Sequence, residues 1–193
     1  MSMAELPFHF KDKPVIVLMG VCGCGKSTIG KALAESLELP FLEGDDFHPP
    51  TNIDKMSRAI PLNDEDRWPW LDRLGIEINR LCTARGGVII SCSALKRSYR
   101  ARISQAVNTP MFFIFLNGTR ETLLKRLKSR KNHYMPTTLL DSQLSTVETP
   151  EADEAALCIS CEQPIDKIIN TIQNTIGKIR NHQFKTKSAD LNF

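Results

Sequence analysis

The chain has 193 residues, a formal net charge of +3, 41% hydrophobic residues and 24% charged residues. This length and composition predict one soluble globular domain, residues 1–193, with a substantial core. The small net charge gives no argument for nucleic-acid binding, and no apolar run is long enough to span a bilayer, so we expect neither nucleic acid nor a membrane as a partner.

Residues 1–13 contain Pro7 and Asp12 and no continuous apolar run, which argues against a secretory signal. Two of the six cysteines, Cys22 and Cys24, lie in a glycine-rich turn that a disulfide bond would distort. We therefore expect the protein to work in a reducing compartment, the cytoplasm.

The first predicted strand, residues 15–19, leads into the sequence Gly-Val-Cys-Gly-Cys-Gly-Lys-Ser and then into helical spacing over 29–37. A G-x-x-x-x-G-K-S turn between a strand and a helix is typical of a phosphate loop, whose backbone N–H groups and helix N-terminus attract a triphosphate. We expect Lys26 to reach the β- and γ-phosphates of ATP and the Ser27 hydroxyl to ligate Mg²⁺. The residues predicted to bind ATP here are Gly20, Val21, Cys22, Gly23, Cys24, Gly25, Lys26, Ser27 and Thr28.

Further apolar runs typical of short buried strands follow along the chain, at 40–43, 88–92, 111–116 and 156–160. Helical segments are predicted between them and after the last one: 52–58, a helix from about Asp66, a helix after Lys96, 119–130, and a helix from Pro164. The start near Asp66 is expected because Pro69 is tolerated in a first turn and not deeper in a helix. The segment 131–148 is polar with weak periodicity, and we interpret it as mobile.

Short apolar strands that alternate with helices predict an α/β fold of three layers, α/β/α, with a five-stranded parallel sheet. In such sheets ligands bind at the carboxyl ends of the strands. Polar residues follow each strand in turn, so this rule brings them to one edge beside the phosphate loop: Asp45, His48, Ser93, Lys96, Asn117 and Gln163. We expect Gln163 on the nucleotide side of this site.

Asp45 directly follows the second strand, where a carboxylate could accept the proton of an acceptor hydroxyl or hold Mg²⁺ through water. Its neighbour Asp46 is an alternative for this role, and an aspartate that only caps a turn is another interpretation.

Two arginines, Arg126 and Arg130, lie four residues apart on one predicted helix, directly before the polar segment. Their guanidinium groups could close over the phosphates and stabilise charge in the transition state. A solvated basic helix face is the alternative interpretation.

Several basic residues are expected to surround an acceptor pocket and so to favour an anionic acceptor: His48, Arg58, Arg67, Lys96 and Arg100. Any one of them could equally be a solvated surface residue, and the argument depends on the set. Arg58 and Arg67 are the first choices for binding a carboxylate.

Four segments, 44–49, 52–56, 61–70 and 91–100, strongly resemble gluconokinases, which are small P-loop kinases related in fold to shikimate and nucleoside-monophosphate kinases. The resemblance covers about residues 14–177 in the expected order. It implies ATP-dependent phosphorylation of D-gluconate at the 6-hydroxyl, a five-stranded parallel sheet, a lid and a homodimer.

The resemblance also divides the chain into a core at about 14–177, a lid at about 131–150 and a C-terminal tail at 178–193. Arg126, Arg130, His133 and the segment 143–150 match the lid region of the family. Two departures are cysteines at positions 22 and 24, where the family usually has serines, and Asn132, where a glycine is common.

Two other functions remain as alternatives. One is a P-loop kinase for a different small anionic acceptor that carries a hydroxyl, such as shikimate, or for a nucleotide. The other is a non-catalytic nucleotide switch, although the sequence contains no N-K-x-D motif for guanine.

Overall fold

The computed structural model describes residues 14–129 and 137–189, except for the side chains of 137, 138 and 180–189. Five strands form one sheet in the order β2-β3-β1-β4-β5, and every neighbouring pair is parallel. The strands are β1 (Val15–Met19), β2 (Phe41–Glu43), β3 (Val88–Ser91), β4 (Met111–Asn117) and β5 (Ala156–Ser160). The predicted five-stranded parallel sheet is therefore confirmed.

Helices connect these strands and follow the last one. They are α1 (Lys26–Ser36), α2 (Pro50–Ser57), α3 (Asp64–Arg85), α4 (Arg97–Ala106), α5 (Arg120–Ser129), α6 (Thr137–Thr146) and α7 (Ile165–Ala189), with a short 3₁₀ helix η2 (Gly44–Phe47) after β2. No helix in the described ranges is long and apolar enough to cross a membrane.

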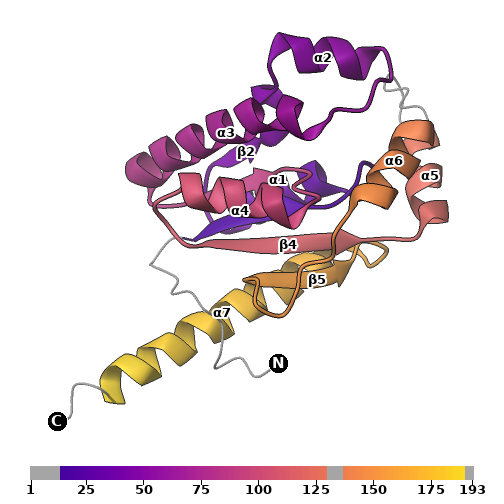
Figure 1. The fold of residues 1–193 in the computed structure, drawn as a ribbon. Helices are drawn as coiled ribbons and strands as arrows, with labels where there is room; N and C mark the ends of the chain where they lie inside the picture. The colour runs from indigo at the N-terminus through magenta and orange to yellow at the C-terminus, as the bar shows by residue number, and fades with distance from the viewer. Residues whose placement is uncertain (1–13, 130–136, 190–193) are drawn as a thin grey trace.

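The residues of β1 are fully buried, and they alternate between two hydrophobic clusters. Ile16 and Leu18 belong to the cluster that contains side chains of α1, α5 and α7, whereas Val15, Val17 and Met19 belong to the cluster that contains side chains of α3 and α4. The sheet is thus the middle layer of a three-layer fold (Figure 1), as the unbroken apolar runs predicted.

Helix α3 begins at Asp64, slightly before the expected start near Asp66, because Asn63 caps it. The side-chain oxygen of Asn63 accepts the Asp66 N–H at 2.9 Å, and the Asp66 carboxylate accepts the Asn63 N–H at 3.0 Å. This reciprocal capping box satisfies two N–H donors at the helix end. Pro69 consequently lies inside the helix.

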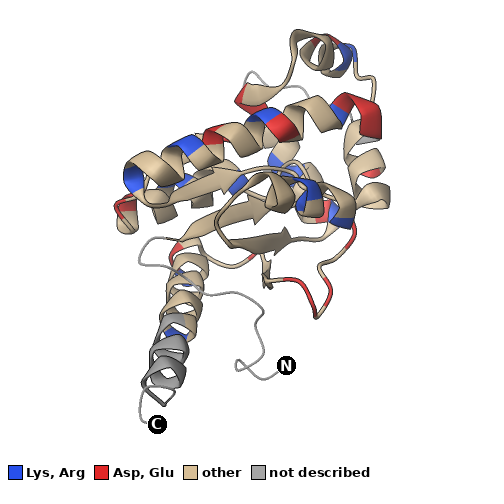
Figure 2. Cartoon of the chain, turned by 60° about the vertical axis from the view of Figure 1, so that its left-hand side comes forward, with Lys and Arg blue, Asp and Glu red and all other residues tan. Residues whose placement is uncertain are grey.

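Residues 137–146 of the polar segment form the helix α6, which the weak periodicity of 131–148 did not predict. Leu140 is fully buried in the α1-side cluster, and Arg120 of α5 forms an ion pair with Asp141 at 2.7 Å. After α6 the chain enters a loop rich in acidic residues (red in Figure 2) before it joins β5.

Candidate active site

The phosphate loop turns sharply between β1 and α1 with the help of glycines. Gly20 and Gly25 have φ angles of +136° and +97°, which residues with a side chain rarely adopt. A Cβ atom on Gly20 would also lie 2.7 Å from the carbonyl oxygen of Leu116. Helix α1 begins at Lys26, so the N–H groups of its first turn, including Ser27 and Thr28, have no partner within the helix. They are therefore suited to bind an anion.

Lys26 folds back over the loop, where its Nζ donates to the carbonyl oxygens of Gly20 at 3.0 Å and Val21 at 3.2 Å. Burial would lower the pKa of Lys26, but the neighbouring Cys24 and Asp45 raise it above its ordinary value. The side chain is therefore a charged ammonium group within the loop.

A side chain from α6 also contacts the loop. The N–H of Cys22 donates to the Oε1 of Gln143 at 2.7 Å, across 121 residues of sequence. Sequence reasoning did not assign Gln143 a role beyond its place in the lid region of the resemblance. Its position in a polar segment with weak periodicity offered no other signal.

The carboxylate of Asp45 lies on the loop side of η2. Its charge helps to raise the pKa of Lys26, and it adds to the effect of burial, which raises the pKa of the Cys92 thiol to about 12. This placement beside Lys26 favours Asp45 over the adjacent Asp46 as the group that faces the phosphate loop.

His48 differs from expectation. It is 7% exposed and stacks on Trp70 with ring centroids 4.1 Å apart, while its Nδ1 lies 3.2 Å from the Nδ2 of Asn52. Burial, with the help of the nearby Arg67 charge, lowers the pKa of His48 to about 4. Because the lowered pKa keeps the ring neutral near pH 7, the structure does not support the prediction that His48 adds positive charge to an acceptor pocket.

Arg100 is also not available to an acceptor. It is 2% exposed and donates to both carboxylate oxygens of Glu154, at 2.5 and 2.7 Å, and to the carbonyl oxygen of Glu148 at 3.1 Å. The guanidinium links α4 to the acidic loop before β5, so the structure gives no support to the predicted contact of Arg100 with the acceptor.

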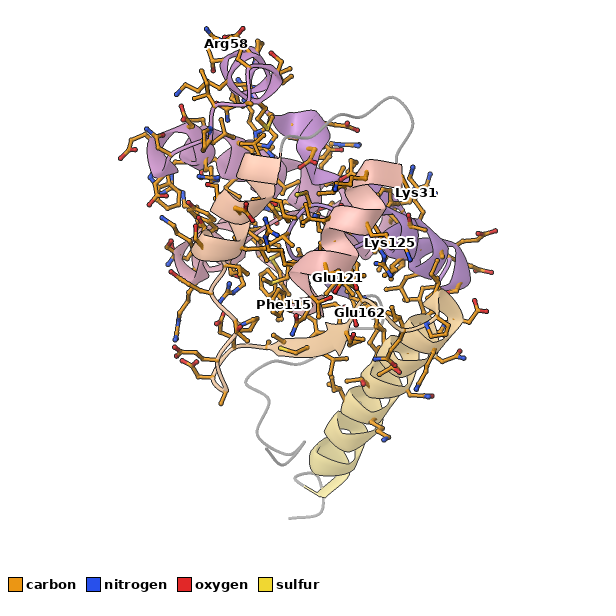
Figure 3. The ribbon with its side chains drawn as sticks, turned by 90° about the vertical axis from the view of Figure 1, so that its right-hand side faces the viewer. Lys31, Arg58, Phe115, Glu121, Lys125 and Glu162 are labelled. Carbon is orange, nitrogen blue, oxygen red and sulfur yellow. The ribbon has the colours of Figure 1, made fainter. Side chains whose placement is uncertain are left out.

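Arg58 lies at the exposed outer end of α2 (Figure 3), where it forms an ion pair with Asp54. Its side chain is 60% exposed, and it does not line the pocket described next.

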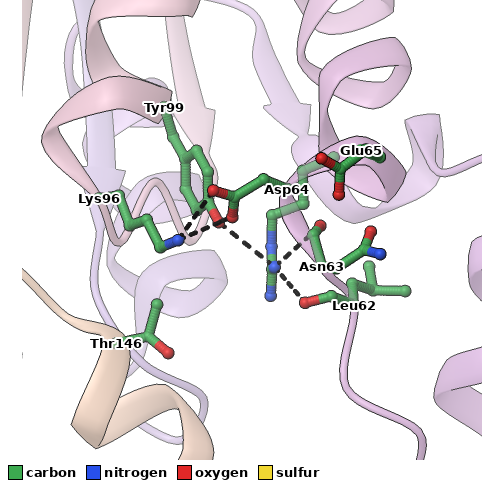
Figure 4. A pocket seen from close by; sticks show the side chains of 8 residues that line it. Leu62, Asn63, Asp64, Glu65, Lys96, Tyr99 and Thr146 are labelled. Carbon is green, nitrogen blue, oxygen red and sulfur yellow. Dashed lines mark hydrogen bonds and ion pairs between the residues drawn. The ribbon is translucent and has the colours of Figure 1, made fainter.

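Arg67 and Lys96 do come together, at a polar pocket of about 380 Å³ between α3, the start of α4 and α6. Lys96 donates to both oxygens of Asp64, at 2.7 and 3.0 Å, and the Tyr99 hydroxyl donates to the same carboxylate (Figure 4). These hydrogen bonds, that of Lys96 first, lower the pKa of Asp64. The pocket is lined by Leu62, Asn63, Asp64, Glu65, Arg67, Lys96, Tyr99 and Thr146.

The pocket and the phosphate loop are neighbours. The N–H of Gly20 donates to the carbonyl oxygen of Ser93 at 3.2 Å, just before Lys96. Helix α6 touches both places, since Gln143 reaches the loop and Thr146, three residues later on the same helix face, lines the pocket.

Arg126 of α5 contacts the turn that follows β5. Arg126 donates to the carbonyl oxygen of Cys161 at 2.8 Å, in the turn that also carries Gln163. In the same turn, Glu162 accepts hydrogen bonds from Thr119 at the N-terminal end of α5 (Figure 3). Arg130, Asn132 and His133 lie outside the described residues.

Comparisons with known proteins agree with this architecture. The family model described as shikimate kinase matches residues 22–177. A probable gluconokinase of Schizosaccharomyces pombe is 46% identical over 162 residues, which is 79% of this chain and 83% of that protein. The thermosensitive gluconokinase of Escherichia coli is 40% identical over 90% of this chain and 92% of its own length.

A solved structure leads to the same family. The crystal structure of a gluconokinase from Sinorhizobium meliloti superposes with a TM-score of 0.81 at 40% identity, over 92% of this chain and 99% of that one. The chain therefore belongs to the gluconokinases, within the wider family of kinases that the shikimate kinase model describes.

Proposed function

We propose that this protein phosphorylates D-gluconate at its 6-hydroxyl with ATP, which yields 6-phospho-D-gluconate. The protein is an ATP-dependent phosphotransferase that acts on an alcohol group, as its family membership shows. The observation that carries the choice of acceptor is the identity of 38–46% to gluconokinases of several organisms. A polar pocket with two cationic side chains next to the phosphate loop supports a small anionic acceptor that carries hydroxyl groups.

In this proposal the loop residues 20–28 bind the phosphates of ATP through backbone N–H groups. Lys26 turns from the loop carbonyl oxygens to the β- and γ-phosphates, and Arg126, together with Arg130, neutralises charge that develops during transfer. Gln163 contributes to the nucleotide site from the turn after β5. The charged state of Lys26 and the place of Arg126 beside that turn support these roles.

Asp45 orients the acceptor hydroxyl or accepts its proton as the oxygen attacks the γ-phosphorus atom. The Asp45 charge helps to raise the pKa of Lys26, and this supports the role because the carboxylate then lies near the group proposed to bind the transferred phosphate. Arg67 and Lys96 bind the acceptor carboxylate, and both line the pocket.

Mg²⁺ is a further part of the proposal, and the oxygen atoms near the loop fit it. Ser27 lies in the first turn of α1, Asp45 lies beside the loop, and the fully buried hydroxyl of Ser91 at the end of β3 has no hydrogen-bond partner. Mg²⁺ prefers oxygen ligands and keeps waters and substrate phosphates in its coordination. Ser27 would hold the ion directly and Asp45 through water, and the bound ion would neutralise negative charge on the phosphates.

The remaining parts of the proposal derive from the length, composition and cysteine positions of the sequence and from the resemblance. They are a single domain over 1–193 with a core at 14–177, a lid at 131–150 and a tail at 178–193, a homodimer, and a location in the cytoplasm. Analytical ultracentrifugation tests the dimer.

The proposed activity is tested by ADP release from ATP and Mg²⁺ in parallel reactions with gluconate, shikimate, a set of nucleoside monophosphates, or no acceptor. We expect release that depends on gluconate, with 6-phosphogluconate identified by mass spectrometry. Release that depends only on another acceptor would reassign the substrate, and hydrolysis without an acceptor would favour a nucleotide switch.

A further inference from the structure

The polar pocket is less cationic than its two basic residues suggest. Lys96 and Arg67 are balanced by Asp64 and Glu65, which line the same pocket. Lys96 already binds both oxygens of Asp64. A site built only to attract an anion would not hold two carboxylates, so the pocket has features suited to neutral polar groups as well.

The hydrogen bonds within the pocket leave the Asp64 carboxylate able to accept a further one. The Asp64 carboxylate accepts three hydrogen bonds, two from Lys96 and one from Tyr99, whereas a carboxylate offers about four lone-pair sites. The ammonium group of Lys96, with its roughly three N–H donors, donates two hydrogen bonds to Asp64. A substrate hydroxyl group can therefore donate to the remaining lone pair of the Asp64 carboxylate.

Tyr99 holds the cluster together. Its hydroxyl donates to Asp64 and accepts from the Nη1 of Arg67 at 3.4 Å. Its ring packs edge-on against Trp68 with centroids 5.5 Å apart, and the residue as a whole is 1% exposed. Because the ring is fixed by packing, the phenolic oxygen stays in place between the carboxylate and the guanidinium.

We propose that Asp64 and Tyr99 determine specificity for the acceptor: Asp64 accepts a hydrogen bond from a hydroxyl group of a polyhydroxy acid, and Tyr99 positions the Asp64 carboxylate to accept it. The inference rests on the proposed kinase activity and adds the residues that recognise the hydroxyl groups of the chain. A site that hydrogen-bonds a substrate hydroxyl discriminates against an analogue that lacks it, because its own polar group is then left without a partner.

The principal test is Asp64→Asn, which keeps the shape of the side chain but weakens its acceptor capacity. We expect KM for gluconate to rise by about tenfold, with kcat and the Kd for ATP within about twofold of wild type. Tyr99→Phe keeps the ring and removes the hydroxyl, and we expect a KM increase of several-fold. Thermal unfolding followed by circular dichroism accompanies each variant, and direct gluconate binding is measured by calorimetry.

Asp72→Asn is the matched control. Asp72 also lies on α3 and binds a cation of the α4 region, Arg102, through two hydrogen bonds of 2.7 and 2.8 Å, but it does not line the pocket. This variant should leave KM unchanged. A similar KM increase in Asp64→Asn and Asp72→Asn would show a general effect of charge or helix packing and would overturn the proposal.

A series of gluconate analogues that each lack one hydroxyl group tests which hydroxyl group Asp64 binds. If Asp64 binds a particular hydroxyl, the KM penalty of Asp64→Asn disappears for the analogue without it and persists for the others. An equal penalty for every analogue, or an unchanged KM for gluconate, would refute the inference. Failure of the proposed function is distinct, because the wild-type protein would then show no gluconate-dependent ADP release.

Discussion

The phosphate loop and the acceptor pocket lie at the same edge of the sheet, but different groups build them. The loop is a continuous stretch of backbone, fixed by glycines with positive φ and by the start of α1. The pocket consists of side chains from three separate parts of the chain: 62–67, 96–99 and α6. A site made of backbone N–H groups depends little on side-chain identity, whereas a site made of side chains changes with every substitution.

The largest loss of activity is expected when Lys26, the lysine of the phosphate loop, is replaced. Lys26→Ala should reduce kcat/KM on the order of a thousandfold, because the ammonium group no longer stabilises phosphate charge in the transition state. A coupled ADP assay measures the loss, and a thermal melt checks that the variant is folded. A folded variant with wild-type turnover would show that the loop does not bind the transferred phosphate as proposed.

Asp45→Asn should lower kcat by about a hundredfold and leave the Kd for ATP nearly unchanged, since we propose that the carboxylate acts on the acceptor hydroxyl. Pre-steady-state kinetics separate the chemical step from binding. Asp46→Asn is the neighbouring control, and a larger loss in that variant would transfer the role to Asp46.

The folded protein should lose stability in acid because the His48 ring is buried in its neutral form. Because the folded-state pKa of His48 is about 4, below the ordinary value near 6.5, the unfolded chain binds a proton first as the pH falls. The contribution of the neutral ring is fully present above pH 6.5 and is lost between pH 6.5 and 4. The free energy of unfolding should fall by about 2 kcal/mol from pH 7 to pH 5 for this reason. Urea unfolding across this range measures it, and His48→Phe should flatten the curve; an equally steep curve in the variant would assign the effect to other groups.

Gln143→Ala should strengthen ATP binding about fivefold. The amide oxygen of Gln143 accepts the Cys22 N–H, which we expect to donate to a phosphate oxygen when ATP is bound. Calorimetric titration with a non-hydrolysable ATP analogue gives the affinity. Weaker binding in this variant would instead show that Gln143 supports the nucleotide.

The smallest effect is expected for the double substitution Cys22→Ser and Cys24→Ser. The N–H of Cys22 is a backbone group, so the replacement should change kcat and the Kd for ATP by less than about twofold. A tenfold change would mean that the thiols themselves shape the loop and would break the contrast between the two sites.

The sheet and the loop could be predicted from the sequence because local patterns determine them. The apolar runs of β1 and β4 are long enough to identify buried strands, and glycine spacing marks the turn without knowledge of distant contacts. The order in which the strands pair did not follow from these patterns, since pairing depends on packing across the whole core.

The acceptor pocket could be predicted only in part. Arg67 and Lys96, which charge and position predicted, line the pocket, but Asp64 and Tyr99 were not predicted, because their contacts span 32–35 residues of sequence. The burial of His48 and Arg100 could not be predicted for the same reason. The sequence shows a basic residue, and only the contact with Trp70 or Glu154 shows that its side chain is buried.

The two tryptophans of the chain are both in the first turns of α3, next to the acceptor pocket. Trp68 contacts Tyr99, while Trp70 stacks on His48 and donates its indole N–H to the carbonyl oxygen of Gly44 at 2.7 Å. All intrinsic indole fluorescence therefore originates within this part of the molecule. The chain therefore carries its own optical probe beside the pocket, and a gluconate titration can be followed in the unlabelled protein by the emission of Trp68 and Trp70.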